Sequence, residues 1–467
     1  MTSLTSAVLA VCDRFDQVGG PEVLPATTYA RARLKEPLRV AVVGDVKAGK
    51  STLINAVVGR KIAATADVEC TKVVTQYKFG ADEGCMLHLA GGNRMPVLLV
   101  NRMLPDRLPV PVDQISHAVV TLSSDLLREF TLIDTPGLST TTAELEVASR
   151  QYVLGASGVR QADAIIYVFR GDQKADDVAF LKEFQRVAGD SSTASAIGVL
   201  SHADGYGKGP WGKEYDPIVR AGERAAEIEK DRASELSAVL PVAGLMAEAS
   251  VIGQLREADA RTLNLLAGLS ELDLRTGQLP QGVSGEDVPR LARMVGEYTI
   301  RHGRGPAAGG TAGLTDWMQS RSGIDAVRAL IRRRYIGRHP QLKAKEAMEQ
   351  LERAAHHYKQ RMPLRRMLSD AKLSPALHPL EEVRAWEALV SRHHDHELLS
   401  VADRLLRSGT DTERVGLPTG SGKADIARRA AEEASAARQF GAGGDPALAR
   451  AAATISLSFT MVADRNR

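Results

Sequence analysis

Apolar and polar positions follow two different periodicities in the two halves of the chain. Between residues 38 and 250, short apolar runs alternate with helical patterns. The most continuous apolar runs cover residues 38–43, 130–134, 164–169, 196–200 and 238–242. Such runs, bounded by turn residues, are typical of buried parallel strands. The first half therefore predicts an α/β fold with a doubly wound sheet.

The second half carries helical patterns and no strand patterns. These patterns cover residues 251–269, 286–300, 323–362, 379–407, 424–440 and 446–462. Residues 2–18 also place apolar side chains at helical spacing, which predicts one helix before the sheet. The fold class is therefore α/β plus all-α.

Two of the expected helices have comparable length: residues 323–362, kinked at Pro340, and residues 379–407. They are typical of the two arms of a helical hairpin, with its turn at 363–378. Four leucines and one methionine in this turn are interleaved with basic residues such as Arg365 and Arg366. This composition suits an anionic membrane surface, but it also suits an ordinary solvated connection, and both interpretations stay open.

Composition and charge restrict the function classes. Lys and Arg number 60 against 57 Asp and Glu, so the net charge of +3 does not favour a nucleic-acid coat. Cys12, Cys70 and Cys85 lack metal-ligand spacing, which favours a reducing compartment. No signal peptide is evident, and the apolar run 451–463 is shorter than the ~20 residues that span a bilayer. We expect a cytoplasmic protein that would meet a membrane peripherally, from its inner face.

The first chemical motif lies directly after the first strand pattern. It is Gly44-x-x-x-x-Gly49-Lys50-Ser51, placed between a strand and a helix, which is the context of a phosphate-binding loop. The glycines let successive N–H groups point at one anion, and the N-terminus of the helix adds its dipole. Lys50 would reach the terminal phosphates, and the Ser51 hydroxyl would bind Mg²⁺.

A second motif follows the strand pattern at 130–134. Asp134-Thr-Pro-Gly137 places a carboxylate at a strand end, where Mg²⁺ is held through water in nucleotide switches. The backbone N–H of Gly137 can sense the γ-phosphate. The tetrapeptide alone is ordinary turn chemistry, but its place downstream of a phosphate loop favours the switch.

These motifs, with Cys70-Thr71-Lys72 and the helical second half, resemble the dynamin superfamily. The resemblance is to bacterial dynamin-like proteins, in particular the isoniazid-inducible type of actinobacteria, and it is specific over residues 38–250. It implies a helix within 1–36 that packs into the trunk, a GTPase domain at 37–250, and a helical trunk at 251–467. A candidate membrane tip would lie near 363–378.

The resemblance also assigns residues. Binding of GTP or GDP would use Gly44, Asp45, Val46, Lys47, Ala48, Gly49, Lys50, Ser51, Thr52, Ser201, His202, Asp204, Ala243 and Gly244. Catalysis would use Lys50, Ser51, Thr71, Asp134 and Gly137. Mg²⁺ would be held by Ser51, Thr71 and Asp134. Asp204 would accept the N–H groups that guanine offers and adenine does not.

The chain departs from the family pattern in three respects. Ser201 and His202 stand where the family usually has Asn or Thr and then Lys, which leaves guanine selectivity open. Lys47 stands where eukaryotic dynamins seat a monovalent cation with a serine. Leu138 stands where small GTPases carry a water-orienting Gln, so backbone groups, Thr71 or a partner molecule must hold the water. We therefore expect slow turnover that rises with self-association.

Three functional hypotheses follow. The leading one is a dynamin-like GTPase that binds Mg²⁺ and GTP, self-associates and remodels an anionic lipid membrane. The second is a weakly hydrolysing or non-hydrolysing scaffold subunit that works with an active paralogue. The third, a soluble GTPase acting on ribosomes or RNA, is disfavoured because no compact RNA-binding module is evident, and we expect no nucleic-acid partner.

Overall fold

The computed structural model describes residues 4–64, 69–137, 143–155, 161–171, 175–187, 193–206, 215–276, 278–393, 395–407, 409–441 and 445–467. Leu138 lies outside these residues. The chain forms two compact units. The sheet unit comprises Arg39–Ala188 and Ser195–Arg332, and the trunk unit comprises Met1–Leu38, Gly189–Ala194 and Arg333–Arg467.

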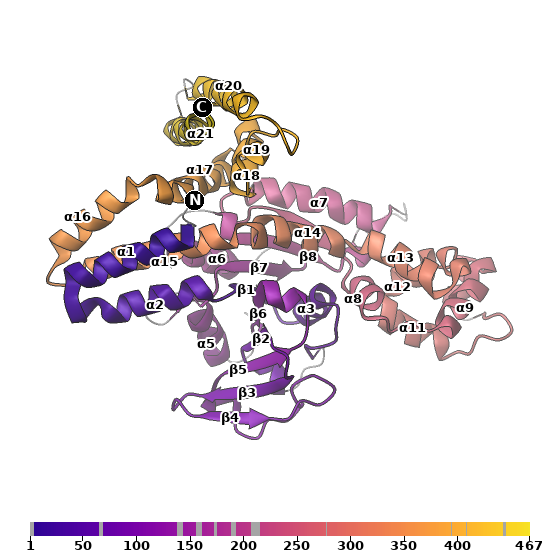
Figure 1. The fold of residues 1–467 in the computed structure, drawn as a ribbon. Helices are drawn as coiled ribbons and strands as arrows, with labels where there is room; N and C mark the ends of the chain where they lie inside the picture. The colour runs from indigo at the N-terminus through magenta and orange to yellow at the C-terminus, as the bar shows by residue number, and fades with distance from the viewer. Residues whose placement is uncertain are drawn as a thin grey trace. The chain divides into compact units, whose positions relative to one another are not determined.

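The sheet unit contains a nine-stranded sheet in the order β4-β3-β5-β2-β6-β1-β7-β8-β9 (Figure 1). Its strands are β1 (Leu38–Gly44), β2 (Thr75–Phe79), β3 (Gly84–Leu89), β4 (Arg94–Val97), β5 (Ile115–Leu122), β6 (Phe130–Asp134), β7 (Ala164–Phe169), β8 (Ala196–Ser201) and β9 (Val239–Val242). The neighbouring strands β1, β7, β8 and β9 pair in parallel. In contrast, β3 pairs antiparallel with β4 and β5, and β2 pairs antiparallel with β6. The sheet is therefore mixed, within the α/β class that the strand patterns predict.

Helices cover this sheet and continue beyond it. They are α3 (Lys50–Val58), α4 (Leu126–Glu129), α5 (Ala143–Leu154), α6 (Ala175–Val187), α7 (Pro217–Asp231), α8 (Gly244–Ile252), α9 (Glu257–Leu265), α10 (Glu271–Thr276), α11 (Asp287–Val295), α12 (Glu297–His302), α13 (Gly310–Ser322) and α14 (Ile324–Arg334). One core lies between the strands and α6, where Ile165 and Phe180 are buried. A second core joins Met246 of α8 to Leu314 of α13.

The boundary between the units differs from the sequence expectation. The strand patterns end before residue 250, but the compact sheet unit continues to Arg332. The reason is the second core, because α8, α9, α11 and α13 bury their apolar faces against one another within this unit. A loss of strand pattern marks the end of the sheet and does not show where the next helices pack.

Apart from Leu38, the first residue of β1, the described elements of the trunk unit are helices and 3₁₀ turns. Its helices are α1 (Leu4–Gly19), α2 (Leu24–Lys35), α15 (His339–Ala355), α16 (Arg361–Lys372), α17 (His378–Arg392), α18 (Glu397–Arg407), α19 (Asp411–Arg414), α20 (Lys423–Phe440) and α21 (Pro446–Arg465). α1 and α2 lie alongside α15 and α16 (Figure 1), and Phe15 and Leu351 are buried in their common core. A separate core unites α17, α18, α20 and α21 around Trp386 and Phe459.

The single long helix expected over residues 323–362 is wrong. The chain there forms α14, a 3₁₀ turn at Ile336–Arg338, α15 and the beginning of α16. Pro340 lies in the first turn of α15, where its missing N–H is tolerated, so it helps to start a helix and does not kink one. The long arm is thus divided into shorter helices.

The expected turn at 363–378 is also mostly helical. α16 occupies residues 361–372, and its side chains Leu364, Met367 and Leu368 are buried in the core with α1. Leu373 and Met362 are instead exposed, with 84% and 65% of their surface accessible. The apolar residues of this segment therefore divide into a buried face and two exposed ends.

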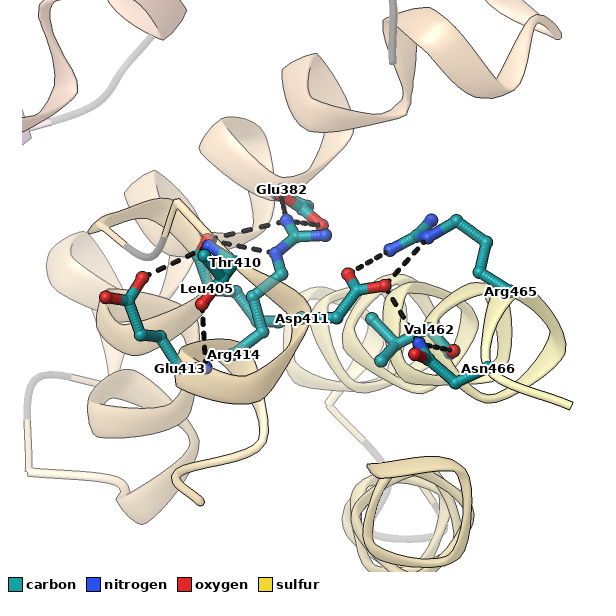
Figure 2. Close-up of polar contacts among 9 residues, drawn as sticks. All are labelled: Glu382, Leu405, Thr410, Asp411, Glu413, Arg414, Val462, Arg465 and Asn466. Carbon is teal, nitrogen blue, oxygen red and sulfur yellow. Dashed lines mark hydrogen bonds and ion pairs between the residues drawn. The ribbon is translucent and has the colours of Figure 1, made fainter. Parts of the chain in front are cut away.

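Charged junctions connect the helices of the trunk unit. The Glu382 carboxylate of α17 accepts two hydrogen bonds from Arg414 of α19, at 2.6 and 2.7 Å (Figure 2). Asp411, at the other end of α19, accepts hydrogen bonds from Arg465 and Asn466 at the end of α21, at 2.7 and 2.9 Å. A helix of one turn thus connects α17 to the end of α21.

α21 has the length and apolar composition of a membrane span, and among the described residues it is the one helix that does. Half of it is buried inside the trunk unit. Ile455, Phe459 and Val462 lie on its buried face, packed in the core with α17 and α20. This burial is typical of a core helix.

Candidate functional site

The phosphate-binding loop predicted from the sequence joins β1 to α3. Gly44, the last residue of β1, has a φ of +147°, and Gly49, which caps α3, has a φ of +91°. A Cβ atom on Gly44 would lie 2.0 Å from the carbonyl oxygen of Val168 on the neighbouring strand. Only glycine fits at position 44, because of both the backbone conformation and this close approach.

Lys50 points back across the loop. Its ammonium group donates hydrogen bonds to the carbonyl oxygens of Gly44 and Asp45, at 3.0 and 2.8 Å. Burial lowers the pKa of Lys50, and the nearby charges of Asp134 and Asp45 oppose that shift. A partly desolvated cation inside a curled glycine loop is suited to bind the charge of a phosphate.

The Asp-Thr-Pro-Gly segment lies directly against this loop. The Thr135 hydroxyl donates a hydrogen bond of 2.9 Å to the carbonyl oxygen of Val42 in β1. Two residues on, a Cβ atom on Gly137 would lie 2.8 Å from the backbone nitrogen of Val46. Burial raises the pKa of the Asp134 carboxyl to about 6, with Lys50 opposing the shift. The two predicted motifs, 90 residues apart in sequence, therefore form one site.

Thr71 lies in a 3₁₀ turn, Glu69–Lys72, just before β2, and is half-buried. Burial raises the pKa of its neighbour Cys70 to about 11, and the charges of Asp106 and Asp134 add to this shift. The segment that carries Thr71 leads into β2, whose first residue, Thr75, lies opposite Asp134 in the antiparallel β2–β6 pair.

The segment from Ser201 to Asp204 follows β8 at the same end of the sheet. Ser201 donates a hydrogen bond of 2.9 Å to the carbonyl oxygen of Phe169 at the end of β7. His202 has a φ of +57°, and its ring carbon Cε1 lies 3.6 Å from the Cβ position of Gly49. An imidazole ring thus packs on the phosphate loop at the residue where the family pattern has a lysine.

The loop after β9 reaches the first turn of α3. Ala243 is buried, and its N–H donates to the carbonyl oxygen of Ser322 at 2.9 Å. The methyl group of Thr52 lies 3.3 Å from the Cβ position of Gly244. The structure therefore brings together the phosphate loop and the loops after β6, β8 and β9.

The geometry fits a nucleotide with a divalent cation. Within the described chain no group of three or more His, Cys, Asp or Glu side chains could hold a metal ion by itself. A Mg²⁺ site of the expected kind needs only hydroxyls, one carboxylate and the phosphate oxygens of the nucleotide. Ser51 at the start of α3 and Asp134 at the end of β6 are residues of this kind.

Sequence reasoning did not single out two structural residues of this site. Thr135 connects the Asp-Thr-Pro-Gly motif to β1 through its hydroxyl. The sequence signal that could have indicated Thr135 is its place in this motif. Gly296, between α11 and α12, lies against Asp204, with Oδ2 2.8 Å from its Cβ position. Nothing in the local sequence connects Gly296 to a position 92 residues earlier.

Comparison with known proteins agrees with the resemblance to the dynamin superfamily. A model of the dynamin family matches residues 40–203. The isoniazid-induced protein IniC of Mycobacterium tuberculosis (strain ATCC 25618 / H37Rv) is 31% identical over 460 residues, which cover 93% of this chain and 91% of IniC. A bacterial dynamin-like protein of Nostoc punctiforme is 27% identical over 161 residues, covering 31% of this chain and 22% of that protein.

A solved structure is also similar. It is described as "An oligomerised bacterial dynamin pair provides a mechanism for the long range sensing and tethering of membranes". It has 13% sequence identity and a TM-score of 0.37, and the match covers 85% of this chain and 61% of that one.

Proposed function

Because the chain belongs to the dynamin family, as a bacterial dynamin-like protein of the IniA/IniC type, we propose that it binds and hydrolyses GTP with Mg²⁺. We propose further that hydrolysis is coupled to self-association on a membrane. The family membership confirms the resemblance drawn from the sequence motifs. The observation that supports the proposal most directly is the contact between Gly137 and Val46, which joins the switch segment to the phosphate loop.

In the proposed mechanism each part of the loop has one task. The backbone from Gly44 to Gly49 holds the phosphates, and Lys50 exchanges its two carbonyl partners for phosphate oxygens. Ser51, Thr71 and Asp134 would hold Mg²⁺, which when bound would neutralise charge on the terminal phosphates. Burial raises the pKa of the Asp134 carboxyl to about 6, whereas the charge of Lys50 opposes this shift and favours the carboxylate.

The attacking water needs an orienting group other than residue 138. That residue is Leu138, whose side chain has no hydrogen-bonding atom. Thr71 and the backbone N–H of Gly137 remain as orienting groups in this chain. A second copy of the chain that docks across the nucleotide would supply the remaining groups that orient the water. Turnover per molecule should therefore rise with protein concentration.

The guanine base would be recognised by Asp204. Its carboxylate can accept the two N–H groups on one edge of guanine, whereas adenine offers no such pair. Ser201 and His202 would support the loop through the carbonyl of Phe169 and through Gly49. Selectivity for guanine is therefore proposed to depend mainly on how the Asp204 carboxylate is oriented.

The trunk unit would bind an anionic lipid surface through α16. Its exposed ends Met362 and Leu373 could enter the headgroup region, while Arg365 and Arg366, also exposed, would attract anionic lipids. This would place the protein peripherally at the inner face of the cell membrane. A paralogous dynamin-like protein is a further proposed partner.

The central test compares GTP with ATP as ligands and substrates of the purified full chain, with and without liposomes. We expect GTP hydrolysis that is stimulated by anionic liposomes and weak binding of ATP. Binding of GTP without turnover, or turnover only when a paralogue is added, would replace this proposal with the scaffold hypothesis. Equal binding of both nucleotides would contradict the guanine assignment.

Self-association is tested by a concentration series. Turnover per molecule should rise between nanomolar and tens of micromolar protein if docking completes the site. A constant specific rate over this range would contradict the proposed role of a second copy. Light scattering on the same samples, with GTP and with GDP, would show whether assembly follows the nucleotide state.

A further inference from the structure

Asp204 packs against the corner where α11 ends and α12 begins. Gly296 forms this corner with a φ of +82°, and Oδ2 of Asp204 lies 2.8 Å from the Cβ position of Gly296. A methyl carbon and a carboxylate oxygen do not approach this closely without displacement. A side chain at position 296 would therefore move the carboxylate, which is the flexible partner in this contact.

Three side chains fix this corner in the sheet unit. The Tyr298 hydroxyl donates a hydrogen bond of 3.1 Å to Oδ2 of Asp216, and Arg321 donates one of 2.7 Å to the Tyr298 hydroxyl oxygen. Arg321 also donates to the Asp216 carboxylate. Tyr298 is buried, and its ring stacks on Trp317 with 6.0 Å between centroids. These contacts tie the start of α12 to Asp216 and to α13.

The Asp216 carboxylate also connects the corner to α7, the helix that follows the Ser201–Asp204 segment. Asp216 caps α7, because its Oδ1 accepts a hydrogen bond of 2.9 Å from the N–H of Ile218. Both α7 and α12 contact the 3₁₀ turn Ala203–Gly205, which carries Asp204. That turn thus lies against two helices that the Tyr298, Asp216 and Arg321 side chains lock together.

We propose that the α11–α12 corner is a positioning element for base recognition, in which Gly296 sets the orientation of the Asp204 carboxylate. In this scheme Tyr298, Asp216 and Arg321 hold the corner in place. The inference rests on the proposed function, because it assigns a task to guanine recognition by Asp204. A carboxylate must present both oxygens to accept two N–H groups, so a small rotation costs binding.

The environment of Asp204 makes its orientation matter. Asp204 is half-buried, and burial raises its pKa, with a smaller contribution from the charge of Glu297. A partly desolvated carboxylate that is turned away from the base is neither fully hydrated nor paired. The family lysine is absent here; the corner packs against Asp204, and His202 packs against Gly49 of the phosphate loop.

The test measures equilibrium binding of GTP, ITP and ATP to the full chain. ITP lacks the 2-amino group of guanine, so the GTP-to-ITP affinity ratio reports on Asp204. In Gly296→Ala we expect GTP affinity to fall at least about tenfold, with ATP affinity unchanged and the GTP-to-ITP ratio close to one. Gly282→Ala is the matched control, because Gly282 also has a positive φ, +91°, but lies against Leu265 and not against Asp204.

A second variant and a coupling experiment separate positioning from general damage. Tyr298→Phe keeps the stacked ring and removes the hydroxyl, so it should lower the GTP-to-ITP ratio in the same direction by a smaller factor. Asp204→Asn should bring the GTP-to-ITP affinity ratio close to one. Adding Gly296→Ala to Asp204→Asn should then have no further effect, because the two changes act on one interaction.

The outcomes are distinct. A wild-type chain that binds GTP and ATP equally would overturn the guanine assignment, and the inference with it. A wild-type chain that prefers GTP, with an unchanged ratio in Gly296→Ala, would overturn only the positioning role. If Gly296→Ala does not fold, an unchanged ratio in Tyr298→Phe overturns that role, and a reduced ratio supports it.

Discussion

Gly137 contacts the backbone of Val46 so closely that a Cβ atom at 137 would lie 2.8 Å from the Val46 nitrogen. This contact places the segment after Asp134 on the phosphate loop. Gly137 is not in a left-handed conformation, so the lack of space, and not backbone strain, requires a glycine at this position.

Replacing Gly137 with Ala should therefore separate the two segments. We expect GTP turnover to fall at least about a hundredfold, because the N–H that is proposed to sense the γ-phosphate would be displaced, while GDP affinity falls much less. Turnover and GDP binding measured on the same sample test this. Gly91→Ala is the matched control, since nothing lies within 4 Å of its Cβ position. Equal loss of GTP and GDP binding in Gly137→Ala would contradict a role in sensing the third phosphate.

A second prediction concerns acid stability of the sheet unit. His88 and His117 are directly opposite in the β3–β5 pair, and their rings stack with centroids 4.3 Å apart. Burial lowers the pKa of His117 to about 4, and the charges of His88, Lys78 and Arg94 add to that shift. A histidine with a depressed folded pKa contributes stability above its unfolded pKa of about 6.5, and this stability is lost as pH falls towards 4.

Wild-type protein should lose stability between pH 6.5 and 4, by up to ~1.4 kcal/mol per pH unit for the His117 proton. His117→Phe keeps an aromatic ring on His88 and removes the proton, so its unfolding temperature should depend less on pH. Thermal unfolding of both proteins between pH 4 and 7 measures the difference. If the unfolding temperatures of the two proteins change with pH in the same way, His117 does not control the loss of stability in acid.

The two motifs of the candidate site can be identified in the sequence because each of them is local. Gly44 to Ser51 and Asp134 to Gly137 each contain a complete motif within eight residues, and both sit at the strand ends where the apolar runs stop. The trunk is less predictable, because helical periodicity gives no unique ending for a helix. Thus the pattern over 323–362 continues across the breaks before α15 and after Ala355.

Contacts that depend on packing could not be predicted. Gly296 meets Asp204, and Asp403 of α18 accepts hydrogen bonds from Trp386 and from the buried guanidinium of Arg338. No residue near these positions in the sequence identifies the partner. Such pairs are fixed by the tertiary arrangement of helices.

A third prediction compares the two ion pairs of α19. Glu382 is 3% exposed, whereas Asp411 is 20% exposed, so the loss of a cationic partner should affect them differently (Figure 2). Arg414→Ala leaves the Glu382 carboxylate buried without this partner and should lower the free energy of unfolding by about 3–5 kcal/mol. Arg465→Ala should cost about 1 kcal/mol or less, since its pair with Asp411 is better hydrated.

Urea unfolding of both variants tests this order. Adding Glu382→Gln to Arg414→Ala should recover part of the lost stability, because the buried group is then neutral. A larger loss in Arg465→Ala than in Arg414→Ala would show that the end of α21, and not the Glu382 junction, determines the stability of the trunk unit.

The last prediction concerns the proposed lipid contact of α16. The exposed ends Met362 and Leu373 can meet a bilayer without unfolding, whereas Met367 and Leu368 are buried in the core with α1. Met362→Gln with Leu373→Gln should therefore weaken sedimentation with anionic vesicles and leave the unfolding temperature unchanged. Changes at Met367 or Leu368 should instead lower the unfolding temperature by creating a cavity or a buried polar group.

The matched control for this surface is Leu98→Gln. Leu98 is 89% exposed and lies in the sheet unit, directly after β4 and outside the basic segment around α16, so its replacement should not change vesicle binding. Arg365→Glu with Arg366→Glu should weaken binding to anionic vesicles more than to neutral ones, since each basic residue contributes about 1 kcal/mol at an anionic surface. Unchanged sedimentation in both α16 double variants would exclude this helix as the membrane contact, because its exposed apolar ends and two of its exposed basic residues would all have been removed.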